Sequence, residues 1–230
     1  MNHSTLLILG ARSDIGMAIA HKFAREGYNI QLAARRAGCL GAEKANVELQ
    51  YRISVTLHEF DALDIASHAA FVATLPELPD VVVCTVGHMG NQSQSEQDVH
   101  AATQVLRTNF EGPASILGAL ANRFEKRGSG TLVGIGSVAG ERGRASNYVY
   151  GSAKAGYIAF LSGLRNRLVK KGVHVVSVLP GFVATKMTDG MDLPTKLTAQ
   201  PNEVATAVFV AVQKKHNIKY DILFFLDCNE

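Results

Sequence analysis

A serine, a tyrosine and a lysine form the group of residues with the clearest chemical use. Ser137 follows the apolar run 131–135, which is typical of a buried strand. Tyr150 and Lys154 lie four residues apart in a segment with apolar residues at helical spacing, so they share one helix face. A nearby ammonium lowers the pKa of a phenol, which is normally about 10, and prepares it for proton exchange with a carbonyl or hydroxyl oxygen. The Ser137 hydroxyl could hold the same oxygen.

The tyrosine and lysine also have an interpretation without chemistry. A Tyr-x-x-x-Lys spacing is common in helices and can be an incidental surface pair. The catalytic interpretation is favoured because a strand-end serine precedes the pair and because the chain carries the nucleotide-binding signals described below.

Composition narrows the classes of protein to consider. The chain has 230 residues, 47% of them hydrophobic, which predicts a single globular domain spanning 1–230. The net charge of +3 comes from scattered lysines and arginines, and therefore gives no case for binding nucleic acid. Cys39, Cys84 and Cys228 have no metal-ligand spacing, so no metal site is expected and a reducing compartment is favoured. We find no candidate membrane span and no signal peptide, and expect a cytoplasmic protein.

Apolar runs and helical patterns alternate along the chain. Strands are predicted at 6–9, 29–34, 54–60, 81–85, 131–135, 173–179 and 220–226. Helices are predicted at 17–25, 39–49, 65–75, 95–127, 148–170 and 202–215, with a bend near Gly112-Pro113 in the longest and an irregular stretch at 182–201.

This alternation predicts an α/β fold. We expect one doubly wound Rossmann-type domain, with a seven-stranded parallel sheet and helices on both faces. Ligands of such sheets bind beyond the carboxyl ends of the strands, and polar or glycine-rich residues follow six of the predicted strands. These residues are Gly10, Arg35, Asp61, Gly87, Ser137 and Pro180.

The first strand leads into a glycine-containing turn. Gly10 ends the strand and Gly16 lies in the first turn of the next helix. Glycines at these positions allow a sharp turn and let a pyrophosphate approach the helix N-terminus. The alternative is a tight turn without a ligand, but its place after the first strand favours a dinucleotide.

The end of the second strand indicates which dinucleotide. An acid there would bind the ribose hydroxyls of NAD, but this chain has Arg35 and Arg36, and Arg12 lies in the glycine turn. Two guanidinium groups could flank a 2′-phosphate, so NADP(H) is favoured over NAD(H). The alternative is that these arginines are ordinary solvated charges.

With these motifs in place, the chain resembles the short-chain dehydrogenase/reductase family from Leu6 to about Phe225. The resemblance implies that Tyr150 is the general acid/base, that Lys154 lowers its pKa and binds the nicotinamide ribose, and that Ser137 positions the substrate oxygen. It also implies that Asn109 holds a water linking Lys154 to solvent. The implied cofactor-binding residues are Gly10, Arg12, Ser13, Ile15, Gly16, Arg35, Asp61, Ala62, Val86, Gly87, Tyr150, Lys154, Pro180, Gly181, Val183 and Thr185.

The chain departs from the family pattern at two places. Asp14 stands where the family usually has a further glycine, and an acid there should point away from a pyrophosphate. The family's Asn-Asn-Ala-Gly after the fourth strand is here Cys84-Thr85-Val86-Gly87, so we expect the asparagine bonds that brace the sheet to be lost.

The resemblance implies an NADP(H)-dependent oxidoreductase that interconverts a small-molecule carbonyl and a secondary alcohol, acting as a homodimer or homotetramer. The alternative is a dinucleotide-binding regulatory or scaffold protein without catalysis, and a related isomerase or dehydratase is a third interpretation. Met187 and Met191 in the stretch 182–201 would suit an apolar lid over the substrate, or plain surface packing.

Overall fold

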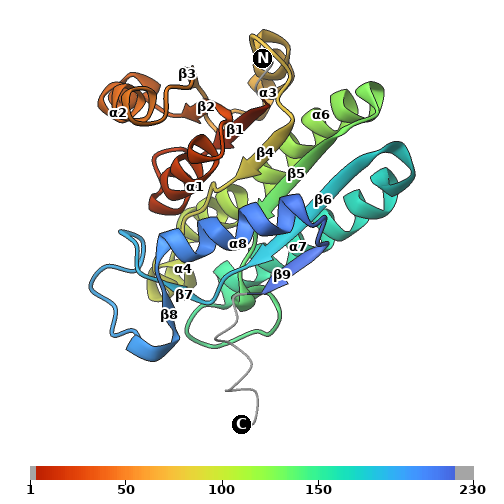
Figure 1. Cartoon of the computed structure of the whole chain (residues 1–230). Helices are drawn as coiled ribbons and strands as arrows, with labels where there is room; N and C mark the ends of the chain where they lie inside the picture. The colour runs from red at the N-terminus through yellow and green to blue at the C-terminus, as the bar shows by residue number, and fades with distance from the viewer. Residues whose placement is uncertain (1–3, 221–230) are drawn as a thin grey trace.

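Seven parallel strands form one continuous sheet in the computed structural model, which describes residues 4–220 (Figure 1). The strands are β1 (Thr5–Leu9), β2 (Asn29–Ala34), β3 (Val55–Glu59), β4 (Val81–Cys84), β5 (Gly130–Ile135), β6 (Val173–Leu179) and β9 (Ile218–Tyr220). Their order across the sheet is β3-β2-β1-β4-β5-β6-β9, so the strand order reverses between β1 and β4. Sheets of this kind bind ligands at that reversal point. The predicted fold class is confirmed.

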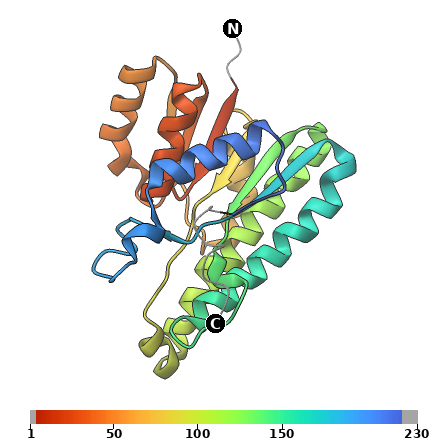
Figure 2. The same cartoon turned by 60° about the horizontal axis from the view of Figure 1, so that its bottom comes forward.

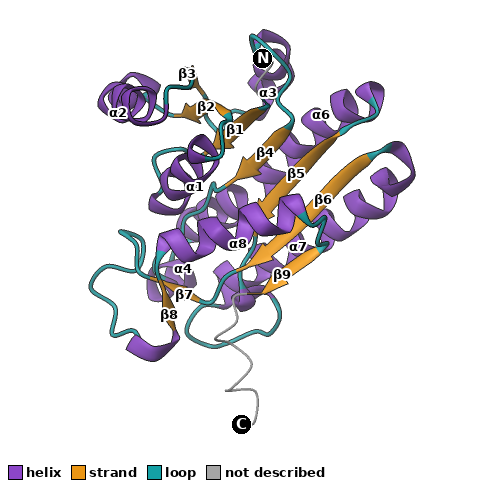
Figure 3. Ribbon diagram, in the orientation of Figure 1, coloured by secondary structure: helices purple, strands orange, loops and turns teal. Residues whose placement is uncertain are grey.

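Helices cover both faces of the sheet (Figure 3). One layer contains α1 (Asp14–Arg25), α2 (Gly41–Tyr51) and α8 (Pro201–Gln213), and the other contains α3 (His68–Thr74), α6 (Gly112–Arg127) and α7 (Tyr148–Leu168). Strand β1 shows why the chain folds this way. Leu6 and Ile8 pack in the first core, Leu7 and Leu9 pack in the second, and all four are fully buried. A wholly apolar strand is stable only between two helical layers.

The region predicted as one helix over 95–127 consists of four consecutive elements: the helix is interrupted at Asp98, and its backbone then continues without a gap through a π-helical turn. They are α4 (Gln92–Gln97), α5 (Val99–Leu106), a π-helical turn η3 (Arg107–Glu111) and α6. The side chains of Asn91 and Asp98 cap α4 and α5 by accepting N–H bonds from Gln94 and His100. The irregular turn falls at η3, while Pro113 lies in the first turn of α6, where a missing N–H costs nothing.

Short elements join the larger ones. They are the 3₁₀ turns η1 (Ala37–Leu40), η2 (Ile65–Ser67), η4 (Val138–Gly140), η5 (Val169–Lys171) and η6 (Thr195–Leu197), and the paired strands β7 (Phe182–Val183) and β8 (Thr198–Ala199). Apart from these elements, the stretch 182–201 is irregular, as predicted, and Figure 2 shows it projecting beyond the start of α8. The last strand, predicted at 220–226, begins at Ile218, and residues 221–226 lie outside the described part.

No helix within residues 4–220 is long and apolar enough to cross a membrane.

Candidate active site

The predicted serine, tyrosine and lysine come together at the carboxyl end of β5. Ser137 follows that strand, and Tyr150 and Lys154 lie in the first two turns of α7. The Tyr150 phenol lies near enough to the Ser137 hydroxyl for that contact to lower its pKa. The Lys154 side chain is only 3% exposed, and its Nζ donates to the carbonyl oxygen of Ile135 at 2.9 Å. A proton-exchanging phenol, a hydroxyl and an ammonium therefore share one small site.

The pKa values of the ionisable groups in this site differ from those expected from the sequence. Burial raises the pKa of Tyr150 to about 12, and the contact with Ser137 offsets only part of that rise. Burial lowers the pKa of Lys154 to about 8. The expected lowering of the Tyr150 pKa is therefore wrong for this structure. The Lys154 ammonium lies 5.7 Å from the centre of the Tyr150 ring and donates to a backbone carbonyl, so desolvation outweighs its attraction for a phenolate.

Asn109 is fully buried in the π-helical turn η3. Its Nδ2 donates to the carbonyl oxygens of His88 and Val105 at 2.6 and 2.8 Å, and its Oδ1 accepts from the His88 N–H at 3.1 Å. The amide therefore braces the segment after β4, a role that sequence reasoning missed. The wide turn of a π-helix is the local feature that carries this side chain inward.

The glycine turn has the expected shape. Gly10 has a φ of 88°, a conformation that favours glycine. Ser13 caps α1, since its Oγ accepts the Gly16 N–H at 2.9 Å. The hydroxyl of this predicted cofactor-binding residue is therefore already used at the start of the helix. Ile15 is partly buried in the first turn, and Arg12 is exposed beside it.

Thr85 braces the glycine turn, so the sheet is joined here without the family's asparagine. Its Oγ1 contacts the carbonyl oxygens of Leu9 and Gly10 at 3.1 and 3.0 Å, and the Ser13 hydroxyl at 3.0 Å. A Cβ placed on Gly16 would come within 2.8 Å of this hydroxyl. The threonine thus joins the first and fourth strands, and it requires glycine opposite it.

The turn after β2 presents the predicted arginines. Arg35 and Arg36 are both exposed, and Arg36 has a left-handed backbone with a φ of 54°. Glu59 at the end of β3 holds this turn, because its two carboxylate oxygens accept the N–H groups of Arg36 and Ala37 at 2.7 and 2.9 Å. These bonds lower the pKa of Glu59. Sequence reasoning missed Glu59, although its position opposite Ala34 in the parallel register would have indicated it.

The remaining predicted residues line the same edge of the sheet. Asp61 follows β3 and accepts the Leu63 N–H at 2.9 Å, while Ala62 is buried against Gly112 of α6. The others follow β4 or β6: they are Val86, Gly87, Pro180, Gly181, Val183 and Thr185. Apart from Asn109 in η3, the predicted site residues thus belong to segments that follow strands or begin helices at the carboxyl edge.

The residues at this edge fit a dinucleotide. The first turn of α1 offers N–H groups to an anion, and the exposed Arg12 and Arg35 offer cations. A Cβ on Gly87 would come within 3.2 Å of the Asn109 Oδ1 and would enter the space beside the Lys154 Nζ, 3.7 Å away. A separate cavity of about 270 Å³ opens among the first residues of β1, β2 and β3, lined by Thr5, Asn29, Ile30, Gln31, Ser54, Thr56, Pro76 and Glu77. It lies at the opposite edge of the sheet from the chemistry.

Comparison with known proteins agrees with this geometry. Residues 4–194 match the model of the family described as short chain dehydrogenase. The chain belongs to the short-chain dehydrogenase family. The resemblance inferred from the motifs is confirmed, and the chain is a dehydrogenase of the class that acts on CH–OH groups.

Relatives and solved structures extend the family match. An uncharacterized oxidoreductase of Mycobacterium tuberculosis strain H37Rv is 40% identical over 205 residues, which cover 88% of this chain and 82% of the relative. A short-chain dehydrogenase from Sphingobium yanoikuyae, solved with NADPH, superposes with a TM-score of 0.86 at 25% identity, covering 94% of this chain and 87% of that one. An alcohol dehydrogenase from Comamonas testosteroni, described as specific for bulky-bulky ketones, superposes with a TM-score of 0.84 at 25% identity. The match covers 96% of this chain and 86% of that one.

Proposed function

We propose that this short-chain dehydrogenase is an NADP(H)-dependent oxidoreductase that interconverts a small-molecule carbonyl and a secondary alcohol. The observation that carries the proposal is that the Tyr150 phenol lies close to the Ser137 hydroxyl, one helical turn from the buried Lys154. Ser137 holds the substrate oxygen, and Tyr150 gives it a proton in reduction or removes one in oxidation. The dinucleotide supplies or accepts the hydride.

The raised pKa of Tyr150 suits the reducing direction, since a neutral phenol is the form that donates a proton. Lys154 is the group that stabilises the resulting phenolate, and it also reaches toward the space over Gly87 where a nicotinamide ribose would lie. Asn109 Oδ1 faces the same space, 3.2 Å from the Cβ that Gly87 lacks, which is compatible with the water relay implied by the family.

The preference for NADP(H) over NAD(H) rests on the arginines and on one neighbouring structure. Arg12 in the glycine turn and Arg35 after β2 are exposed cations, and the Sphingobium yanoikuyae structure contains NADPH. The other cofactor contacts are proposed for the family-matched residues named above. Glu59 does not compete for ribose hydroxyls, since both its oxygens accept backbone N–H groups.

We further propose that residues 1–230 work as a single catalytic domain in the cytoplasm, assembled as a homodimer or homotetramer. Exposed apolar side chains support assembly through α5 and η3. Val99 is 72% exposed, Leu106 40% and Phe110 39%.

The test is oxidation of NADPH, followed at 340 nm, with a panel of aldehydes and ketones. We expect turnover, at least about tenfold greater kcat/KM with NADPH than with NADH, and a loss of kcat of about 10²–10⁴-fold in Tyr150→Phe. Ser152→Ala, which removes an exposed hydroxyl from the same helix, is the control and should retain activity. Full turnover by Tyr150→Phe would exclude the mechanism, and NADPH binding without turnover on any carbonyl would favour a non-catalytic binding protein.

A further inference from the structure

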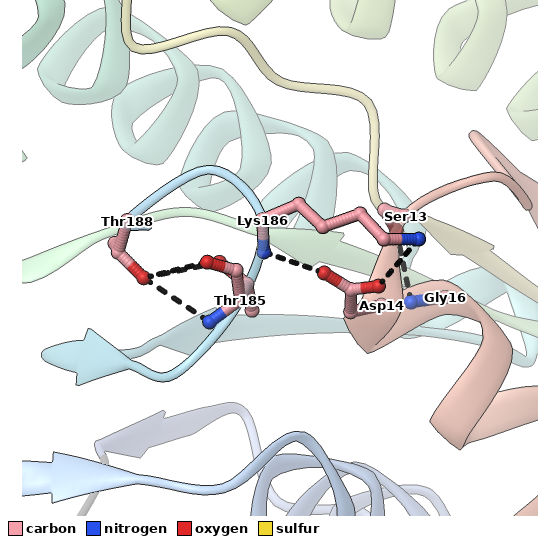
Figure 4. Close-up of polar contacts among 6 residues, drawn as sticks. All are labelled: Ser13, Asp14, Gly16, Thr185, Lys186 and Thr188. Carbon is pink, nitrogen blue, oxygen red and sulfur yellow. Dashed lines mark hydrogen bonds and ion pairs between the residues drawn. The ribbon is translucent and has the colours of Figure 1, made fainter. Parts of the chain in front are cut away.

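Asp14 connects the start of α1 to a segment 172 residues further along the chain (Figure 4). One carboxylate oxygen, Oδ2, accepts the backbone N–H of Lys186 at 2.7 Å. The other, Oδ1, lies 3.4 Å from the Lys186 Nζ. Both oxygens of the acid that replaces the family's glycine are therefore directed at one residue.

Lys186 belongs to a turn that holds its own shape. The Thr188 N–H donates to the Thr185 carbonyl oxygen at 3.0 Å, and the Thr185 N–H donates to the Thr188 Oγ1 at 3.1 Å. The Thr188 hydroxyl also donates to the carbonyl oxygen of Val183 at 2.7 Å. Because these bonds join residues 183–188, a contact that holds Lys186 holds the whole turn.

The same turn reaches the catalytic lysine. A Cβ built on Gly87 would lie 3.8 Å from the Met187 Cε and 3.7 Å from the Lys154 Nζ. Lys186 and Met187 are adjacent, yet one contacts the start of α1 and the other approaches the site at the end of β4. The turn therefore spans the edge of the sheet where a dinucleotide of this family would lie.

We propose that Asp14 and Lys186 form a clamp that closes the turn 185–188 over the dinucleotide cleft. Asp14 is then a positioning residue that sets how long the dinucleotide stays bound. The inference rests on the proposed function, because it assumes that a dinucleotide occupies this cleft. A glycine at position 14 has no side chain with which to make this contact.

The strengths of the two contacts suit a clamp that opens and closes. The Lys186 side chain is 87% exposed, so its ion pair is screened by water and contributes little. The bond from a backbone N–H to a carboxylate is charge-assisted and is the stronger of the two. Opening the turn breaks only these contacts to α1, while the bonds within residues 183–188 can persist.

The first experiment measures NADPH release by stopped-flow fluorescence, with excess NADP⁺ to prevent rebinding. Asp14→Ala removes both contacts and should release NADPH about tenfold faster. Asp14→Asn keeps an oxygen for the Lys186 N–H, and Lys186→Ala keeps the N–H itself, so each should show a smaller increase. The double variant Asp14→Asn/Lys186→Ala should match the single variants, since both lose the same ion pair. Lys186→Arg should release NADPH at the unaltered rate.

The control is Lys196→Ala, which removes the same charge from an exposed lysine ten residues along the same segment and should leave release unchanged. Thermal unfolding of every variant separates loss of the clamp from loss of the fold. Unchanged release by a folded Asp14→Ala protein would overturn the proposal. Slower release would also overturn it, because it would mean that the carboxylate acts by repelling the pyrophosphate.

A second experiment needs no ligand. Hydrogen exchange of peptides covering residues 184–189 should be faster in Asp14→Ala than in the unaltered protein, because the Lys186 N–H loses its acceptor. Equal exchange would overturn the clamp. If the unaltered protein bound no NADPH at all, the proposed function would fail, and the exchange measurement would still report separately on the Asp14–Lys186 contact.

Discussion

Lys154 shows at the scale of one residue how this site departs from an ordinary helix surface. A lysine that is 3% exposed has lost almost all of its hydration, and a single carbonyl oxygen at 2.9 Å replaces it. Burial of this kind disfavours the ammonium, which is why the pKa of Lys154 falls to about 8. Near neutral pH the group is still mostly protonated, because its pKa of about 8 lies above that pH.

This shift predicts how stability depends on pH in the ligand-free protein. Between pH 8 and about 10.5 the unfolded chain keeps a proton on Lys154 that the folded protein releases, so stability should rise with pH across that window. The contribution reaches about 3 kcal/mol, from ~1.4 kcal/mol per unit of pKa. Urea unfolding of the unaltered protein and of Lys154→Met, from about pH 7 to 10, measures this contribution. If the free energy of unfolding changed with pH equally in the two proteins, the prediction would be contradicted. The raised pKa values of Cys84 and Tyr150 act in the opposite direction, from about pH 9 and about pH 10, so the Lys154 contribution is the difference between the two proteins.

At the scale of elements, the contact between the ends of β1 and β4 gives the glycine turn its shape. Thr85 stands where the family has an asparagine, and its one hydroxyl contacts two carbonyl oxygens and the Ser13 hydroxyl. The lost asparagine is therefore replaced in part by a smaller side chain. The start of α1 depends on this contact, because Ser13 is also the residue that caps the helix.

Thr85→Val keeps the shape of the side chain and removes this hydroxyl. We expect a loss of about 1 kcal/mol in the free energy of unfolding, because the hydrogen bonding of the hydroxyl is lost while the Leu9 and Gly10 carbonyl oxygens keep the N–H groups of Thr85 and Ser13 as donors. Thr206→Val is the matched control. Its hydroxyl is exposed on α8 and donates only to the Asn202 carbonyl oxygen, so the change should stay within about 0.5 kcal/mol. Equal effects of the two substitutions in chemical denaturation would show that Thr85 does not brace the turn.

The elements also show what could be predicted from the sequence. Strands such as β1 and β4 were predictable because they are buried on both faces and hence wholly apolar. The interruption at Asp98 and the π-helical turn η3 were missed, because one capping residue and one extra residue in a turn barely disturb a long helical pattern.

Within the site, the candidate residues were predictable from their types and spacing, but the pKa values of their side chains were not. The direction of the Tyr150 pKa shift depends on how closely other atoms surround the phenol, which spacing does not reveal. The contact between Asp14 and Lys186 joins positions 172 residues apart, and no local pattern marks such a pair.

At the scale of the whole molecule, exposed apolar side chains indicate where a second copy would bind. Leu106 and Phe110, with Val99, are exposed apolar side chains on α5 and η3, and burying them would require a partner surface. Leu106→Lys should shift the sedimentation of the protein from dimer or tetramer toward monomer. Leu49→Lys, on the exposed face of α2 across the sheet, is the control and should not change the assembly. Sedimentation of the unaltered protein as a monomer would contradict the proposed assembly.

The tight packing around Thr85 has a consequence for exchanging parts between relatives. A Cβ at position 16 would lie 2.8 Å from its hydroxyl, and one at position 10 would lie 3.0 Å away. Residues 10–16 and residue 85 therefore behave as one module, although 69 positions of chain separate Gly16 from Thr85. A chimera that imports a glycine turn from another dehydrogenase should also import the residue that follows its fourth strand.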